Sequence, residues 1–188
     1  MQAVLMSIQP KWCELIVTGK KTVEVRKTTP KLKPPFKVYI YCTADTVKRV
    51  VFDEYGDRQI ELIPQRIIGE FVCEKLCWVL AHPSIFAGHP MFFQKSIDDA
   101  CLTQEEVEAY SKGKDVFGWV ISQLKIYEKP KELREFQNPC KEYQRDNPQC
   151  GNCDFYRSRG EYPAECACEG AKPIVKAPQS WCYVEELK

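Results

Sequence analysis

The chain has 188 residues, of which 44% are hydrophobic and 28% are charged, and its formal net charge is +1. This length suits one folded domain with a hydrophobic core, and a charge so close to zero argues against binding of duplex nucleic acid through bulk charge. No apolar stretch has the length of a membrane-spanning helix and residues 1–10 lack a signal-peptide pattern, so we expect a cytoplasmic protein without membrane contact.

The first elements in the chain are a predicted strand and a short helix. Residues 3–8 are an apolar run, and Pro10 suits the first turn of a helix because its missing N–H costs nothing there. The apolar stripe of this helix consists of Trp12, Leu15 and Ile16. Gly19 then fits the helix end, where a left-handed backbone is needed.

Residues 19–26, with the sequence GKKTVEVR, place several charged side chains next to this turn and lead into a strand predicted over residues 22–27. Side chains alternate along a strand, so Val23 and Val25 face one side while Thr22, Glu24 and Arg26 face the other. The valine side suits the core. The polar side suits a cleft for a ligand.

The remaining elements are mostly strands. We expect them over residues 36–43, 66–79, 116–127 and 180–185, with a hairpin between 49–51 and 59–62. The alternation breaks near Cys77 and Trp78, which indicates a bulge or bend, and Gly118 indicates another bend. Thr103 and Glu106 form a capping box that starts a short helix ending near Gly113. Short strands around two small helices, without βαβ alternation, predict an α+β fold built on a mixed β-barrel.

A polar, Pro- and Cys-rich segment interrupts this pattern before the last strand. The chain has eleven cysteines, and without a secretory signal such thiols indicate metal binding rather than disulfides. The spacing of Cys150 and Cys153 is one half of a structural zinc site. The candidate ligands are Cys140, Cys150, Cys153, Cys166 and Cys168, four of which would hold zinc in a closed, structural site. The alternatives are a disulfide or redox role, or thiols without a special role.

Several motifs together resemble the ASCH domain of the PUA-like superfamily. They are SIQPKW at residues 7–12, the GxKxxExR spacing of residues 19–26, IGEF at 68–71, GW at 118–119 and PQSW at 178–181. The resemblance implies a PUA-like mixed β-barrel with short flanking helices, formed by residues 1–130 and closed by a strand in residues 174–188. Residues 131–173 would then be a Cys-rich, zinc-binding insertion.

The resemblance also implies a function, since family members are thought to bind RNA. Some small bacterial members hydrolyse N4-acetylcytidine, and at least one is described as a ribonuclease. In the amidohydrolase branch the signature Lys, here Lys21, acts together with a Thr three positions later. This chain carries Glu24 at that position. The difference favours recognition of RNA or a modified nucleotide over hydrolysis.

The residues of the signature have chemistry suited to a nucleotide. Arg26 can form paired hydrogen bonds with a phosphate or a base carbonyl, and Glu24 can accept from an exocyclic amine or act as general base. A partly buried Lys21 would have a lowered pKa and could act as base or nucleophile. We therefore predict Lys21 and Glu24 as the catalytic pair if the protein is an enzyme. The predicted binding residues are Trp12, Lys20, Thr22 and Arg26. The alternative is an exposed Glu–Arg ion pair beside solvated lysines, with Trp12 in the core.

Overall fold

A computed structural model describes residues 2–44, 49–53, 55–56, 59–82, 91–139 and 172–187 of the chain. The strands are β1 (Gln2–Ile8), β2 (Val23–Arg26), β3 (Phe36–Cys42), β4 (Arg49–Phe52), β5 (Gln59–Leu62), β6 (Arg66–Ala81), β7 (Met91–Phe92), β8 (Val116–Lys131) and β9 (Trp181–Glu185). The helices are α1 (Pro10–Val17), α2 (Gln94–Asp99), α3 (Gln104–Ser111) and the short 3₁₀ helix η1 (Leu133–Glu135). None of the described helices is long and apolar enough to cross a membrane.

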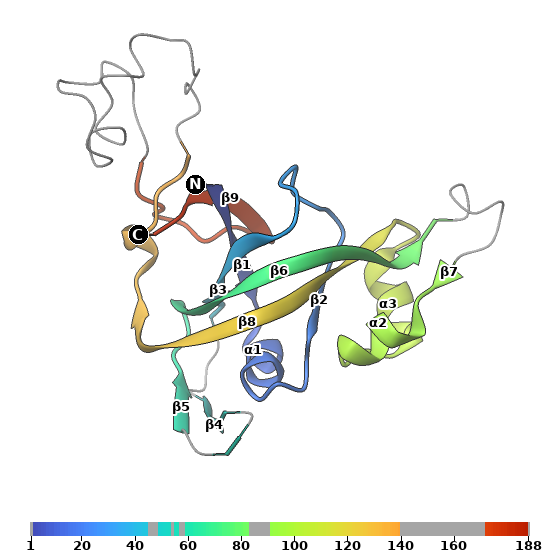
Figure 1. The fold of residues 1–188 in the computed structure, drawn as a ribbon, viewed down its shortest axis with the longest axis horizontal. Helices are drawn as coiled ribbons and strands as arrows, with labels where there is room; N and C mark the ends of the chain where they lie inside the picture. Colours follow the sequence, from blue (N-terminus) through green and yellow to red (C-terminus); the bar gives the residue numbers. More distant parts are fainter. Residues whose placement is uncertain are drawn as a thin grey trace, which may run out of the picture.

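One sheet dominates the fold (Figure 1). It has seven strands, six of them in the order β2-β8-β6-β3-β1-β9, and β7 pairs with the end of β6. The pair of β1 and β3 is parallel and the other pairs are antiparallel, so the predicted mixed α+β fold is confirmed. The predicted hairpin is also confirmed, as the separate sheet of β4 and β5. No pairing joins β2 to β9 in the described part of the chain. A closed barrel is therefore not shown.

Helix α1 forms where the sequence predicts it. It begins at Pro10, and Cys13, Ile16 and Val17 are buried on its inner face. Gly19 has a φ of 70°, the left-handed backbone expected after the helix. Side chains of α1 pack with those of β1, β3 and β6 in the largest core cluster. The helix therefore fixes the start of β2 against the sheet.

The two faces of β2 separate as the alternation predicts. Val23 and Val25 are buried with residues of β6 and of both short helices, including Ile97 of α2 and Val107 of α3. Helix α3 has the predicted capping box, in which Thr103 Oγ1 accepts from the Glu106 N–H at 3.2 Å. Helix α2 is not among the elements that the sequence predicts. The packing of α2 and α3 leaves the Glu24 and Arg26 side of β2 facing a different space.

Gly118 serves close packing between strands. It lies near the start of β8, opposite Val25 of β2 and Cys77 of β6. A Cβ atom there would lie 2.8 Å from Val23 Cγ1, 2.9 Å from Cys77 Sγ and 3.0 Å from Val79 Cγ2. The glycine is thus required by its neighbours. The predicted break of alternation near Cys77 and Trp78 is confirmed as shifts of the β6–β8 register on either side of these residues.

The Cys-rich segment falls largely outside the described residues. Its five candidate zinc ligands, Cys140, Cys150, Cys153, Cys166 and Cys168, all belong to the part that is not described. The two ends of this part meet on the core. The Asn138 N–H donates to the Lys172 carbonyl oxygen at 3.0 Å, and the Ile174 N–H donates to the Phe136 carbonyl oxygen at 2.8 Å. Phe136 itself is buried against Tyr39, with ring centroids 4.8 Å apart.

Candidate functional site

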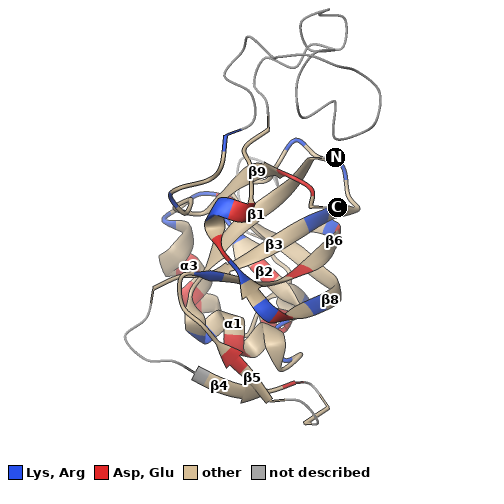
Figure 2. Ribbon diagram, turned by 90° about the vertical axis from the view of Figure 1, so that its left-hand side faces the viewer, with Lys and Arg blue, Asp and Glu red and all other residues tan. Residues whose placement is uncertain are grey.

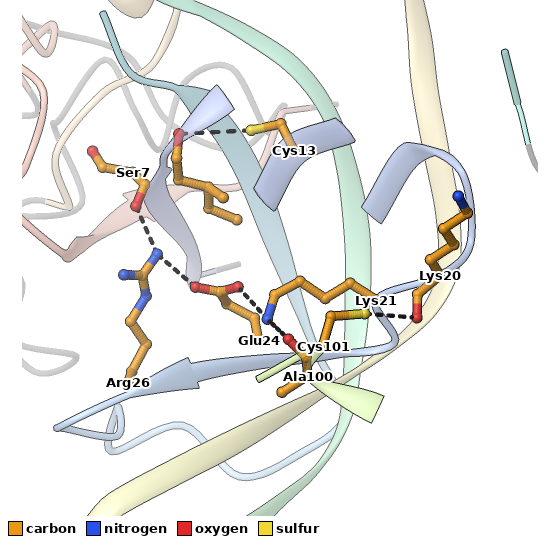
Figure 3. A network of polar contacts seen from close by, with 9 residues as sticks. Ser7, Cys13, Lys20, Lys21, Glu24, Arg26, Ala100 and Cys101 are labelled. Carbon is orange, nitrogen blue, oxygen red and sulfur yellow. Dashed lines mark hydrogen bonds and ion pairs between the residues drawn. The ribbon is translucent and has the colours of Figure 1, made fainter. Parts of the chain in front are cut away.

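The signature residues form a buried chain of charges at the edge of the sheet (Figure 3). The Glu24 carboxylate lies between two cations, with Oε1 3.0 Å from Arg26 Nη2 and Oε2 3.5 Å from Lys21 Nζ. The side chains of Lys21 and Glu24 are 2% and 5% exposed, and that of Arg26 is 13% exposed. The alternative of an exposed ion pair is therefore wrong. Burial makes each of these charges dependent on its partners.

Lys21 reaches the carboxylate from the turn between α1 and β2. Its Nζ donates to the carbonyl oxygen of Ala100, the residue that ends α2, at 2.6 Å. It also lies 4.9 Å from the centre of the Trp12 ring. Burial lowers the pKa of Lys21, while the nearby Glu24 carboxylate and Cys101 thiol act in the opposite direction. The lowered pKa that the sequence leads us to expect is thus supported, with burial as its main cause.

Arg26 is held between two strands. Its Nη2 atom donates to the Ser7 carbonyl oxygen of β1 at 2.6 Å, in addition to its contact with Glu24. Two atoms of this network, Arg26 Nε and Glu24 Oε2, are buried without a hydrogen-bond partner among the described residues. Buried polar atoms are rarely left without a hydrogen bond, and here Arg26 Nε has none among the described residues while Glu24 Oε2 has only its 3.5 Å ion pair with Lys21 Nζ.

A cavity of about 620 Å³ opens above this network. Its lining comes from the end of β1, from α1, β2 and α3, and from the segment before β9. The lining residues are Ser7, Gln9, Lys11, Trp12, Lys21, Glu24, Val25, Arg26, Thr43, Leu102, Glu106, Ala109, Tyr110, Gln179 and Ser180. Distant parts of the chain are joined here because the Ser7 N–H donates to the Ser180 carbonyl oxygen at 2.9 Å and Ser7 Oγ donates to the Pro178 carbonyl oxygen at 2.6 Å.

Not every predicted site residue lies at this cavity. Trp12, Lys21, Glu24 and Arg26 line it, and Lys20 and Thr22 do not. Lys20 is exposed, and its carbonyl oxygen accepts from the Cys101 thiol at 3.2 Å. Thr22 lines a second cavity, of about 480 Å³. Regular strand structure starts only at Val23, so the alternation that assigned Thr22 to the polar face does not extend to it.

Two parts of the lining are not among the residues that the sequence predicts. Gln9, Gln179 and Ser180 belong to the SIQPKW and PQSW motifs, so the sequence carried a signal for them that was used only for the family resemblance. Glu106 and Tyr110 of α3 had no such signal, because only the tertiary packing of α3 beside β2 brings them to the cavity.

Comparisons with known proteins find one family model and several solved structures that are similar to this chain. Residues 6–82 match the sequence model of the ASCH domain family. The fold is similar to the crystal structure of the ASCH protein from Zymomonas mobilis, with a TM-score of 0.50 at 16% identity over 98% of this chain and 88% of that one. A mutant form of the same protein gives a TM-score of 0.54 at 14% identity, over 98% and 89% of the two chains. No curated protein matches the chain. At these identities the structural likeness concerns the fold.

Proposed function

We propose that the chain, whose residues 6–82 match the ASCH family model, binds RNA or a modified nucleotide in the cavity above Glu24 and Arg26. The observation that carries the proposal is a pair of buried atoms without a hydrogen bond among the described residues, Arg26 Nε and Glu24 Oε2, the latter held only by its 3.5 Å ion pair with Lys21 Nζ. A carboxylate oxygen accepts hydrogen bonds, and a guanidinium N–H donates them. The edge of a nucleobase presents a donor beside an acceptor, which complements this pair.

Size and charge support the same ligand. A cavity of about 620 Å³ lies within the range of small-molecule sites, and one nucleotide fits it. Lys21 and Arg26 provide two positive charges against the single negative charge of Glu24. Lys11 and Glu106, the other charged residues of the lining, offset each other, so one positive charge remains and favours a ligand with an anionic group such as a phosphate.

Titration calorimetry with the four ribonucleosides and N4-acetylcytidine tests this proposal. Wild-type protein should bind at least one of them. Glu24→Gln should weaken that binding about 10- to 100-fold, because a hydrogen bond to a charged group is lost. Tyr110→Ala changes the cavity wall without touching the ion pairs, and it should also weaken binding. Glu128→Gln, an exposed change on β8, is the matched control. Equal affinities in all four proteins would place the ligand elsewhere.

A second candidate function is amidohydrolysis of an N4-acetylcytidine-like nucleoside. Burial lowers the pKa of Lys21, which favours its use as a general base. Its contacts with Glu24 and the Ala100 carbonyl oxygen favour the protonated amine instead, and for this reason we rank recognition first. Incubation with N4-acetylcytidine decides between the two. Release of cytidine that disappears in Lys21→Met would establish the enzyme. We rank a ribonuclease below both.

We also propose a structural zinc ion held by four of the cysteines Cys140, Cys150, Cys153, Cys166 and Cys168. The support is the spacing of Cys150 and Cys153 in the sequence. Elemental analysis of the purified protein tests the metal site, and a zinc content well below one ion per chain would remove it.

A closed PUA-like barrel is likewise our proposal for the finer architecture.

A further inference from the structure

Two lysines each lie over an aromatic ring of the cavity lining, and Lys11 is itself a lining residue whereas Lys27 is not. Lys11 Nζ lies 4.2 Å from the centre of the Trp12 ring, and Lys27 Nζ lies 4.8 Å from the centre of the Tyr110 ring. Trp12 and Tyr110 both line the cavity. An ammonium group over a ring face is held by the ring quadrupole, so these contacts keep both cations beside side chains of the cavity wall.

We propose that these two lysines bind the phosphates on either side of a nucleotide seated in the cavity, so that the ligand is a single-stranded polynucleotide rather than a free nucleoside. The inference rests on the proposed function, since it needs a base in the cavity. It adds the class of ligand and two positioning residues, neither of which belongs to the GxKxxExR signature.

The two cations belong to different parts of the fold. Lys11 lies in the first turn of α1, whereas Lys27 follows β2 and rests on α3. Figure 1 shows α1 and α3 as separate helices below the sheet and at its side. The chain after Lys27 is anchored to β9, because Trp181 Nε1 donates to Thr28 Oγ1 at 3.0 Å. A mononucleotide carries phosphate at only one end of its sugar. A strand that enters and leaves the cavity has a phosphate for each lysine.

The net charge of the protein is too small to attract phosphates in bulk, so phosphate binding depends on particular lysines. In the view of Figure 2 basic and acidic residues are interspersed over the ribbon, as expected for a net charge of +1. Besides Glu24, a second acidic residue, Glu106, lines the same cavity. Its carboxylate accepts from the Thr103 N–H at 2.9 Å, at the N-terminus of α3, where the helix dipole offsets negative charge. Bulk attraction is therefore weak, and the two ammonium groups are the main candidates for phosphate.

The salt dependence of binding tests this inference on the full-length protein. The probe is a fluorescent single-stranded RNA of about six nucleotides with mixed sequence, compared with the ribonucleosides. Each phosphate contact on a single strand contributes about 0.7 to the slope of log affinity against log salt. Wild-type affinity for the RNA should fall about 7-fold between about 50 and about 200 mM salt, while nucleoside affinity should not change.

Lysine variants then assign the contacts. Lys11→Gln and Lys27→Gln should each reduce the same fall to about 2.6-fold, and the double variant should abolish it. Lys125→Gln, an exposed lysine on β8 outside the cavity lining, should behave as wild type. Nucleoside binding without tighter, salt-dependent RNA binding would overturn this inference alone, as would unchanged slopes in both lysine variants. Binding of neither RNA nor nucleoside would overturn the proposed function as well.

Discussion

Glu24 is the residue on which the buried network depends. It contacts both Lys21 and Arg26, and it is 4% exposed. Charges at such depth are tolerated because each cation has an anion beside it. The site is thus stabilised by the same carboxylate that is proposed to bind the ligand, and stability and recognition cannot be separated at this position.

We therefore expect unequal costs from neutralising the two ends of the Lys21–Glu24 contact. Glu24→Gln leaves two cations without an anion and should lower the free energy of unfolding by about 3–5 kcal/mol. Lys21→Met removes one cation and leaves the Glu24–Arg26 pair intact, so its cost should be clearly smaller. Urea denaturation at neutral pH measures both. A larger loss for Lys21→Met would mean that the carboxylate is not the centre of the network.

The pH dependence of stability should show the burial of Lys21. Burial lowers its pKa in the folded protein below the ordinary value of 10.5. Between the lowered pKa and about 10.5 the unfolded chain holds a proton that the folded protein has released, so unfolded chains bind more protons and stability rises with pH. Below this window both states are protonated, and the cost of the buried ammonium is present in full.

The measurement is the difference in unfolding free energy between wild type and Lys21→Met from neutral pH to about 10.5. Wild type should gain relative to the variant as the pH rises, because Lys21→Met has no such group and the other titrations are shared. A flat difference would show that the pKa of Lys21 is the same in the folded and unfolded states.

At the scale of elements, the position of β2 is set by the side chains that pack against its core-facing side. Gly118 of β8 leaves room for Val23, Cys77 and Val79, which lets β2 lie close to β8 and β6. Since Val23 and Val25 fix one face of β2, they also fix where Glu24 and Arg26 point. The packing on the core side of β2 thus determines the geometry on the cavity side.

Gly118→Ala should therefore lower the free energy of unfolding by about 1–3 kcal/mol through overpacking. The added methyl group would lie 2.8 Å from Val23 Cγ1. Val23→Ala makes room for it, so the double variant should be less destabilised than the sum of the two single changes. A double-mutant cycle by thermal or urea unfolding measures this coupling. Strict additivity would mean that the two residues do not compete for space.

Elements whose signals lie within a few residues can be predicted from the sequence, and contacts between distant segments cannot. Helix α1 and the faces of β2 were predicted because Pro10, Gly19 and the alternation of Val23 and Val25 act within a few residues. Helix α2 has six residues, too few to show a helical period, and Ile97 is its one buried residue. The contribution of α3 to the cavity depends on contacts between distant segments, and a local sequence pattern does not predict such contacts.

At the scale of the whole molecule, the cavity and the core are assembled from both ends of the chain. Ser7 of β1 is bonded to the segment before β9, and β9 pairs with β1 along its length. The last strand is therefore part of the same folding unit as residues 6–82, which match the ASCH family model, although more than 30 residues separate it from the preceding described segment. The fold is complete only when these two segments meet.

Deletion of residues 140–171 tests whether the segment between them is needed for that unit. Asn138 and Lys172 are joined by a hydrogen bond of 3.0 Å, and Phe136 and Ile174 are joined by one of 2.8 Å, so a short Gly–Ser linker can connect the two ends. A change in loop length alters the entropic part of the folding free energy by only about 1 kcal/mol. We expect the deletion variant to unfold cooperatively with a stability within about 1 kcal/mol of wild type. If the cysteines bind zinc, it should also lose the metal. Failure of the metal-free variant to fold would show that this segment, with its cysteines, contributes to the stability of the whole molecule.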